Sequence, residues 1–491
     1  MKHPQRFFLL CVVLLVAVFL AGVQFWIKPA IEGEVTVLIN ESLKAQGLTP
    51  TSPVQATVSP FTRKLLLPAF DLAPNPATGL QKGHVKPSET IMTYQGLLAF
   101  SPLRELFTPK SGNITFVQQS LCQGLTMEVN GASVSLETLT AREVGLDAEK
   151  FRELLADPHA KGKYPKLSLQ LLRMDRCAIK VQAGNVTLAM GPMTFEKMSP
   201  QRLDHLIIEN IEGLEQGHKK FHSSRLVQDN IRIFTEEETL ALVAKLTMGS
   251  DEARAEELLK LFIGDQPLVE KTSLQGLTLD VDGSPVNLKE ITFSTKAGKE
   301  ERFTVTGLVL AGKTIEEQLK EKLPIPALLH LNLSLGERKE SEKTRKLSAS
   351  LGIDELFSLD LELSADLDTL ENLFDKLLTC PLHNVNLTYT DKSLLARATL
   401  YAAPQMANKE FLVAQITNNL NGSPFERDLA AKLCSFVEKP GLVNIASLPG
   451  KTFTATELTQ LQDTDLGKFL QLTVTQGSED LNQSILRLKS E

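Results

Sequence analysis

Gln123–Thr140 reads QGLTMEVNGASVSLETLT, and Gln275–Thr292 reads QGLTLDVDGSPVNLKEIT. The two stretches are identical at nine of 18 positions and are offset by 275 − 123 = 152 residues. Each alternates around a central dipeptide, Asn130-Gly131 or Asp282-Gly283, of the kind preferred in a two-residue type I′ turn. The sequence therefore predicts two β-hairpins. Alternation and turn rules alone would produce part of the match, but nine identities favour divergence from one ancestral unit.

The turn determines which residues face each other across each hairpin. Val129 then opposes Ala132, and Val281 opposes Ser284. Steps of two residues away from the turn place apolar side chains on one face and mostly polar side chains on the other. A looser third copy, Cys177–Thr194, repeats the pattern with a four-residue loop. We expect function to lie on this apolar face, which comprises Leu125, Met127, Val129, Val134, Leu136, Ile179, Val181, Leu188, Leu277, Leu279, Val281, Val286 and Leu288.

A second signal lies at the N-terminus, where Phe7–Ile27 reads FFLLCVVLLVAVFLAGVQFWI without a charge. At about 1.5 Å per residue this run crosses a hydrocarbon core of about 30 Å. Lys2 and Arg6 precede it, which predicts a cytoplasmic N-terminus and an exported body. A cleaved signal peptide is the alternative, but its apolar region would be about 7–15 residues long and end at a small-x-small site. We expect an uncleaved transmembrane anchor over residues 1–28.

Residues 29–50 predict a juxtamembrane amphipathic helix. Ile31, Val35 and Leu38 recur at helical spacing, and Gly47 is a suitable stop. The apolar face of this helix would lie on the membrane or cover one end of the following sheet. The second role is commoner for a helix with so few charges.

The remaining chain alternates between β-rich and helical patterns. Short strands, Thr90–Phe100 among them, are expected after residue 50, and helical inserts are expected at 148–156, 236–246, 252–262 and 314–323. The predicted fold class is α+β. It comprises the anchor, antiparallel hairpin repeats forming a curved sheet with helical inserts at 51–350, and a smaller α+β C-terminal module at 351–491.

Composition and motifs argue against several function classes. The 491-residue chain has a net charge of −7 and 6% aromatic residues, which argues against a nucleic-acid partner. His218 and His222 lack the glutamate of a metalloprotease pair and are expected on a surface loop. No phosphate-binding or nucleophile motif is present. We expect no catalytic residue, no cofactor and no metal, and therefore no enzyme.

Four cysteines lie in the predicted exported body: Cys122, Cys177, Cys380 and Cys434. An even number in an exported protein permits two disulfides. Cys122 would pair with Cys177, and Cys380 with Cys434. The alternative is four buried thiols.

The hairpins also carry a family resemblance. Through its N-terminal helix, the strand series Thr51–Val117 and the units Leu125–Leu139 and Leu277–Ile291, the chain resembles the AsmA-like and YdgA-like envelope proteins of Gram-negative bacteria. The stretch VNLTYTDKSLLARATLYAA from Val385 resembles the last module of uncharacterised exported proteins that are built similarly. The resemblance implies a bacterial inner-membrane protein with a periplasmic body, and its motifs specify a sheet rather than site residues. In larger relatives a long curved sheet with an apolar interior is thought to handle lipid.

Two functional hypotheses follow from these observations. In the first, the apolar face is open and binds phospholipid or another hydrophobic ligand, in a role in envelope homeostasis. In the second, the body is a non-catalytic scaffold or interaction module for envelope proteins, and its own helices cover the face. An open apolar surface favours the first hypothesis, and a helix-packed core favours the second.

Overall fold

The protein is described here by a computed structural model that covers residues 23–109, 111–149, 152, 167–182, 184–234, 268–281, 284–296, 300–311, 326–341, 343–367, 379–402, 408–422, 424–460 and 467–490. The chain forms two compact units, Met1–Arg254 and Ala255–Glu491, called unit 1 and unit 2 below. The division falls well before residue 351. Strands that we assigned to the hairpin-repeat domain therefore share a unit with the C-terminal module.

Unit 1 begins with a helix that caps the edge of a sheet. After η1 (Val23–Ile27), α2 (Lys28–Ala45) buries Ile31 and Val35 against the first strands, while Gly47 has a φ of 72° just past the helix end. The predicted helix is confirmed, and of its two expected roles it covers one end of the sheet. Three α2 side chains accept hydrogen bonds from alternate backbone N–H groups: Glu32 from Val58 (2.7 Å), Thr36 from Ala56 (3.0 Å) and Asn40 from Val54 (3.0 Å).

The spacing of these three acceptors explains the contact. Residues four apart lie on one face of a helix, and alternate N–H groups point to one side of an extended strand. Val58 pairs with Leu65 on its other edge. The polar side chains of α2 thus cover a strand edge that would otherwise be open to pairing with another chain.

The other elements of unit 1 form an antiparallel sheet. The pairing order is β1–β2–β5–β6–β8–β9–β12–β13, with β3–β4–β7 joining at β8 and with β10 and β11 both lying between β9 and β12. The bounds are β1 (Thr57–Ser59), β2 (Lys64–Leu67), β3 (Phe70–Leu72), β4 (Leu80–Val85), β5 (Ser88–Met92), α3 (Tyr94–Ala99), α4 (Arg104–Phe107), β6 (Asn113–Cys122), β7 (Leu125–Val129), β8 (Ala132–Asp147), β9 (Leu169–Val181), β10 (Val186–Met190), β11 (Met193–Met198), β12 (Arg202–Glu215) and β13 (His218–Arg232).

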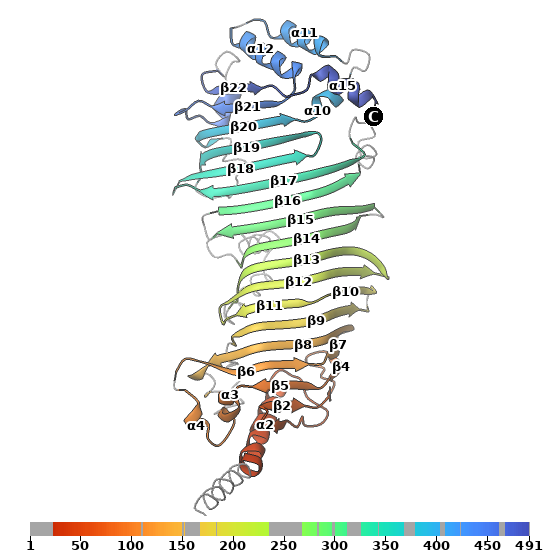
Figure 1. The fold of residues 1–491 in the computed structure, drawn as a ribbon, viewed down its shortest axis with the longest axis vertical. Coiled ribbons are helices and arrows are strands. Elements are labelled where there is room, and N and C mark those ends of the chain that lie inside the picture. The colour runs from red at the N-terminus through yellow and green to blue at the C-terminus, as the bar shows by residue number, and fades with distance from the viewer. Residues whose placement is uncertain are drawn as a thin grey trace, which may run out of the picture. The chain divides into compact units, whose positions relative to one another are not determined.

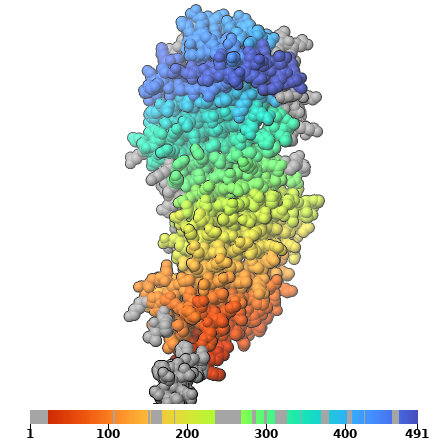
Figure 2. All heavy atoms as spheres, viewed as in Figure 1, coloured from red at the N-terminus to blue at the C-terminus, as the bar shows by residue number. Residues whose placement is uncertain are grey.

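Unit 2 is a meander in which each strand pairs with the next in sequence, as Figure 1 shows from green to blue. Bands of colour follow one another in the same order on the surface drawn in Figure 2. The bounds are β14 (Val269–Val281), β15 (Ser284–Lys296), β16 (Glu300–Ala311), β17 (Leu328–Lys339), β18 (Thr344–Ile353), β19 (Phe357–Asp366), β20 (Leu382–Asp391), α10 (Leu394–Ala402), α11 (Lys409–Asn419), α12 (Pro424–Glu438), β21 (Leu442–Ser447), α13 (Ala455–Gln460), β22 (Leu470–Thr475) and α15 (Leu481–Ser490).

The predicted registers of the three hairpins are confirmed. Val129 pairs with Ala132 in β7–β8, and Leu279 pairs with Val286 in β14–β15. In the looser copy Ile179 pairs with Leu188. Asn130 and Gly131 have φ values of 48° and 77°, both positive as a type I′ turn requires.

Two local predictions are wrong. Tyr94–Ala99 is helix α3 and not part of a strand, because Thr93 accepts a hydrogen bond from Gly96 N at 2.9 Å and caps the helix start. His218 and His222 lie on strand β13 and not on a loop.

Several predictions fall on residues outside the described ranges. These are the run up to residue 22, the inserts at 236–246, 252–262 and 314–323, most of 148–156, and the Asp282-Gly283 dipeptide. Within the described ranges, no helix has both the length and the apolar character that a bilayer crossing requires. The described sheet and helices agree with the α+β class.

Candidate functional site

The strands of unit 2 have one apolar face. Residues directly opposite on neighbouring antiparallel strands share a face. Two rows of paired residues cross β17–β22 and a third crosses β18–β20, and together they are called the unit 2 apolar face: Leu335, Ala349, Leu361, Leu387, Ile445 and Leu472; Leu333, Leu351, Leu359, Tyr389, Val443 and Val474; and Leu347, Leu363 and Val385.

The first of these rows extends further into the sheet. Leu335 pairs with Phe303 on β16, which pairs with Phe293 on β15. The row therefore carries apolar side chains, without a polar interruption, from β15 to β22. The second row also extends further, from Leu333 through Val305 on β16 and Ile291 on β15 to Leu274 on β14.

The opposite face of the same strands is polar and hydrogen-bonded. Lys346 pairs with Glu362 at 3.0 Å across β18 and β19, and Asn444 Nδ2 donates to Thr388 Oγ1 at 2.9 Å across β20 and β21. Such cross-strand polar pairs suit a face that meets water. The sheet is therefore amphipathic, and its two faces call for different surroundings.

The unit 2 apolar face is only partly buried. Leu335 is 45% exposed. Most other members of the face are partly buried rather than fully enclosed. Apolar side chains on one face at this level of exposure indicate a surface that can accept a further apolar body.

Two clusters cover parts of the face. Cys380 and Phe453 pack against the row of Leu347, Leu363 and Val385. At β20, the Tyr389 ring lies 6.1 Å from that of Phe436 on α12, in an edge arrangement. Coverage is thus concentrated at two margins of the described face.

A polar pair of the buried Asp391 and the half-buried Tyr389 marks the end of β20. Burial raises the pKa of the Asp391 carboxyl, while hydrogen bonds from Tyr389 and Leu395 act in the opposite direction. Tyr389 Oη donates to Asp391 Oδ1 at 2.7 Å, and Leu395 N donates to the same oxygen at 3.0 Å. Burial also raises the pKa of the Tyr389 phenol, which keeps its proton. The pair therefore anchors the start of α10 rather than presenting a reactive group.

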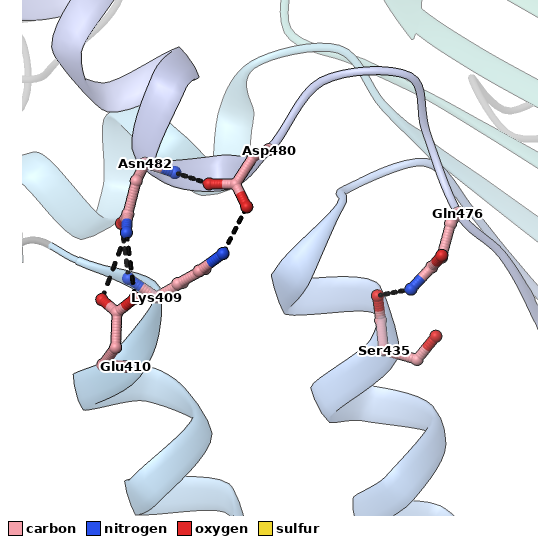
Figure 3. Close-up of polar contacts among 6 residues, drawn as sticks. All are labelled: Lys409, Glu410, Ser435, Gln476, Asp480 and Asn482. Atoms are coloured by element: carbon pink, nitrogen blue, oxygen red, sulfur yellow. Dashed lines mark hydrogen bonds and ion pairs between the residues drawn. The ribbon is translucent and has the colours of Figure 1, made fainter.

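Polar contacts hold the helices of unit 2 together (Figure 3). Lys409, at the start of α11, forms an ion pair with Asp480, and its backbone N–H donates to Asn482 Oδ1 at 2.8 Å. Gln476, just after β22, donates to the backbone carbonyl of Ser435 on α12 at 3.3 Å. These contacts join α11 to the start of α15, and α12 to the end of the sheet.

A cavity of about 360 Å³ lies between α12 and the β21–β22 end of the apolar face. Its apolar lining comes from the helix on one side and the strands on the other: Phe425, Leu429, Ile445, Leu448, Leu470 and Leu472. Asp428 and Lys432 are the charged residues of the lining, and they form an ion pair with each other at 2.6 Å.

The apolar residues predicted in unit 1 also come together. One row pairs Met127, Val134, Ile179 and Leu188 in succession. Leu125 pairs with Leu136, and Val181, which is 39% exposed, pairs with Val186. Thr126 and Glu128, which alternate with Leu125, Met127 and Val129 along β7, are exposed.

In unit 2, Leu277 pairs with Leu288, and Val281 pairs with Ser284. Sequence reasoning missed the larger face on β17–β22. The sequence signal for this face was the alternation in His330–Leu335 and Phe357–Ser364, which we interpreted as separate strands.

The four cysteines are free thiols in this structure, so the predicted disulfides are not formed. Cys122 pairs with Leu139 and Cys177 with Leu136, on opposite edges of β8. Because β8 lies between them, the two cysteines are separated by two strand spacings, or about 9–10 Å. This distance exceeds the Cα separation of about 4.4–6.8 Å in a disulfide. Cys380 packs with Phe453, and Cys434 faces α11.

Among the residues that the structure describes, no cluster of His, Cys, Asp and Glu has the geometry to hold a metal ion. His222 Nδ1 lies 3.5 Å from Glu212 Oε1 across β12 and β13. The described residues of unit 2 do form the apolar face and the cavity at its β21–β22 end.

Comparison with known proteins gives one match. A family model described as an uncharacterized protein matches residues 342–477, a segment that contains β18–β22 and the whole cavity lining. No curated protein and no solved structure matches the chain. The matched segment thus includes the β18–β22 part of the candidate site, and its description names no activity.

Proposed function

We propose that this chain is a membrane-anchored envelope protein of AsmA-like type that binds phospholipid acyl chains on the unit 2 apolar face. The observation that carries the proposal is the uninterrupted apolar row across β17–β22, with Leu335 45% exposed at its start. Covering apolar surface is favourable by about 25 cal/mol per Å². An acyl chain lying along the row would remove that surface from water.

The proposed location rests on the N-terminal sequence. The uncharged run Phe7–Ile27, with Lys2 and Arg6 before it, supports a single span in a bacterial inner membrane and a periplasmic body. Protease added to spheroplasts should digest a C-terminal tag. A tag that stays intact until the cells are lysed would place the body in the cytoplasm and contradict this location.

Lipid binding can be tested with two neighbouring residues on β17. Leu335 lies on the apolar face, and Ser334 lies on the polar face. The full chain should be purified from membranes in mild detergent as wild type, Leu335→Glu and Ser334→Glu, and co-purifying phospholipid measured by native mass spectrometry. A charge on the apolar face should remove most of the lipid, because an ionised carboxylate opposes apolar contact.

The matched variant Ser334→Glu should keep the lipid, because its charge points to the polar face. Equal lipid content in all three proteins, or no lipid in the wild type, would contradict acyl-chain binding at this surface. Thermal unfolding of each variant shows whether the fold survives.

A second candidate function is a non-catalytic scaffold or an interaction module for envelope proteins. The observation in its favour is the packing of Cys380, Phe453 and α12 on part of the face. If wild-type protein lacks lipid but recovers envelope proteins after cross-linking in cells, and Leu335→Glu does not change their recovery, the scaffold function is the better description.

A further inference from the structure

We propose that the cavity beneath α12 binds the terminal segment of a single unbranched alkyl chain, so that a lipid enters this site tail first. The inference rests on the proposed function and adds to it a defined end point for the chain. Its basis is the position, lining and charge of the cavity.

The cavity lies where the first apolar row ends. Ile445 and Leu472 line it, and they are the last two members of the row that begins at Leu335. Leu387 pairs with Ile445 and leads back to Leu361 on β19. A chain that follows the row toward β22 therefore arrives at the cavity without crossing a polar side chain of these strands.

The lining selects an uncharged occupant. Phe425 and Leu429 face the strands from α12, and a volume of about 360 Å³ falls in the range of small-ligand sites. Water gains little in an apolar cavity, because it finds few hydrogen-bond partners there. Asp428 and Lys432 neutralise each other, so the lining offers no unpaired charge to a phosphate or carboxylate headgroup.

The length of an acyl chain and the spacing of the strands then locate the headgroup end of the ligand. An acyl chain spans half of a hydrocarbon core, or about 15 Å. Neighbouring strands lie about 4.8 Å apart, so this length covers about three strand intervals. A chain whose tip is in the cavity at β22 would bring its headgroup to β19, near Leu361. There the face borders β18 and β17, where Leu335 is exposed.

The test uses the full chain in lipid nanodiscs and two palmitic acid probes. One probe carries a photoreactive diazirine at the last carbon, and the other carries it next to the carboxylate. Peptide mapping after illumination should place the tip probe on α12 and β22, and the head probe on β18 and β19. Leu429→Trp fills the cavity and should lower tip labelling of α12 and β22 by about tenfold, equivalent to about 1.4 kcal/mol.

Thr473→Trp is the matched control, because Thr473 is the exposed neighbour of Leu472 on the polar face of β22. It should leave both labelling patterns unchanged. If Leu429→Trp does not fold, Ile445→Phe fills the cavity from the sheet side and should give the same loss.

The outcomes separate the two proposals. Tip labelling confined to β17–β19, or unchanged by the cavity-filling variants, would overturn the tail-first site and leave acyl-chain binding on the face standing. Labelling of neither the face nor the cavity by either probe would overturn both.

Discussion

The first hairpin, β7–β8, and the second, β14–β15, share their register but differ in the strand that leads into the turn. Leu125 pairs with Leu136 in one, and Leu277 pairs with Leu288 in the other. In the first hairpin the leading strand is broken at Gly124, where its outer partner changes from β5 to β4. In the second, β14 continues through the equivalent Gly276.

The two hairpins show that the pairing register is set locally, whereas the continuity of the leading strand depends on its neighbours. Both glycines have positive φ, 147° at Gly124 and 58° at Gly276, so the shared Gln-Gly dipeptide marks a distortion of the strand in both copies. The turn and the alternation set the pairing of each hairpin. The neighbouring strands decide whether the distortion becomes a break.

The largest expected contrast is between the matched leucines. Leu277 is 7% exposed, whereas its counterpart Leu125 is only partly buried. Leu277→Ala should lower the local opening free energy of its hairpin by about 3 kcal/mol, and Leu125→Ala by about half as much, because the lost contacts scale with burial. Hydrogen exchange of the β7–β8 and β14–β15 amides measures both. Equal losses would mean that the two copies are packed alike.

The matched glycines should give the next contrast. A Cβ at position 124 would lie 2.9 Å from the Glu137 carbonyl oxygen. Gly124→Ala should therefore cost about 2–3 kcal/mol, combining backbone strain with this close contact. Gly276→Ala adopts the left-handed region at a cost of about 1 kcal/mol. The same exchange experiment applies, and a greater loss at Gly276 would show that continuity of β14 depends on its glycine.

A smaller effect concerns acid stability at equivalent positions. Glu290 in the second hairpin and Thr138 in the first share a place in the repeat. Hydrogen bonds from Ser273 and Gln275 lower the pKa of Glu290, and a hydrogen bond from Thr138 lowers that of Asp175. A lowered pKa adds stability above the unfolded-state value of about 4, and that stability is lost as the pH falls through the folded-state value.

Glu290→Gln should flatten the acid side of the local stability profile of the β14–β15 pair only, and Asp175→Asn that of the β8–β9 pair only. Hydrogen exchange at a series of pH values, corrected for intrinsic exchange, reports this. An unchanged profile in either variant would mean that its hydrogen bond contributes nothing to folding.

The smallest change in stability is expected from substitution of Cys122. Its counterpart in the second hairpin is Leu274, and the pairings Cys122–Leu139 and Leu274–Ile291 are equivalent. The thiol thus occupies an apolar position, and Cys122→Ala should cost about 1 kcal/mol or less. Reduction should leave the mobility of the wild-type chain on gels unchanged. A shift on reduction would show a disulfide that this structure does not contain.

Sequence reasoning succeeded where structure is decided by neighbours in the chain. Asn130-Gly131 was sufficient to predict the register of β7–β8, and the helical spacing of Ile31 and Val35 was sufficient to predict α2. It failed at Tyr94–Ala99, whose β-like composition is overridden by tertiary packing. A Cβ on Gly96 would lie 2.2 Å from the Phe116 carbonyl oxygen, so α3 sits directly on β6.

The candidate site was predicted only in part, for a related reason. Alternation in Phe357–Ser364 showed that β19 would be two-faced, but it carries no information on which strands lie beside it. The row from Leu335 to Leu472 exists only after six strands are paired. The cavity beneath α12 similarly requires the helix to be placed on the sheet.

The contact of Glu32, Thr36 and Asn40 with alternate amides of the first extended segment has a mechanical consequence. The three hydrogen bonds are spaced along two turns of α2, so they fix the orientation of the helix relative to the extended segment. A tilt of the chain at Val23 would therefore be transmitted through α2 to β1. The direction in which the chain enters α2 thus sets the orientation of the sheet that follows.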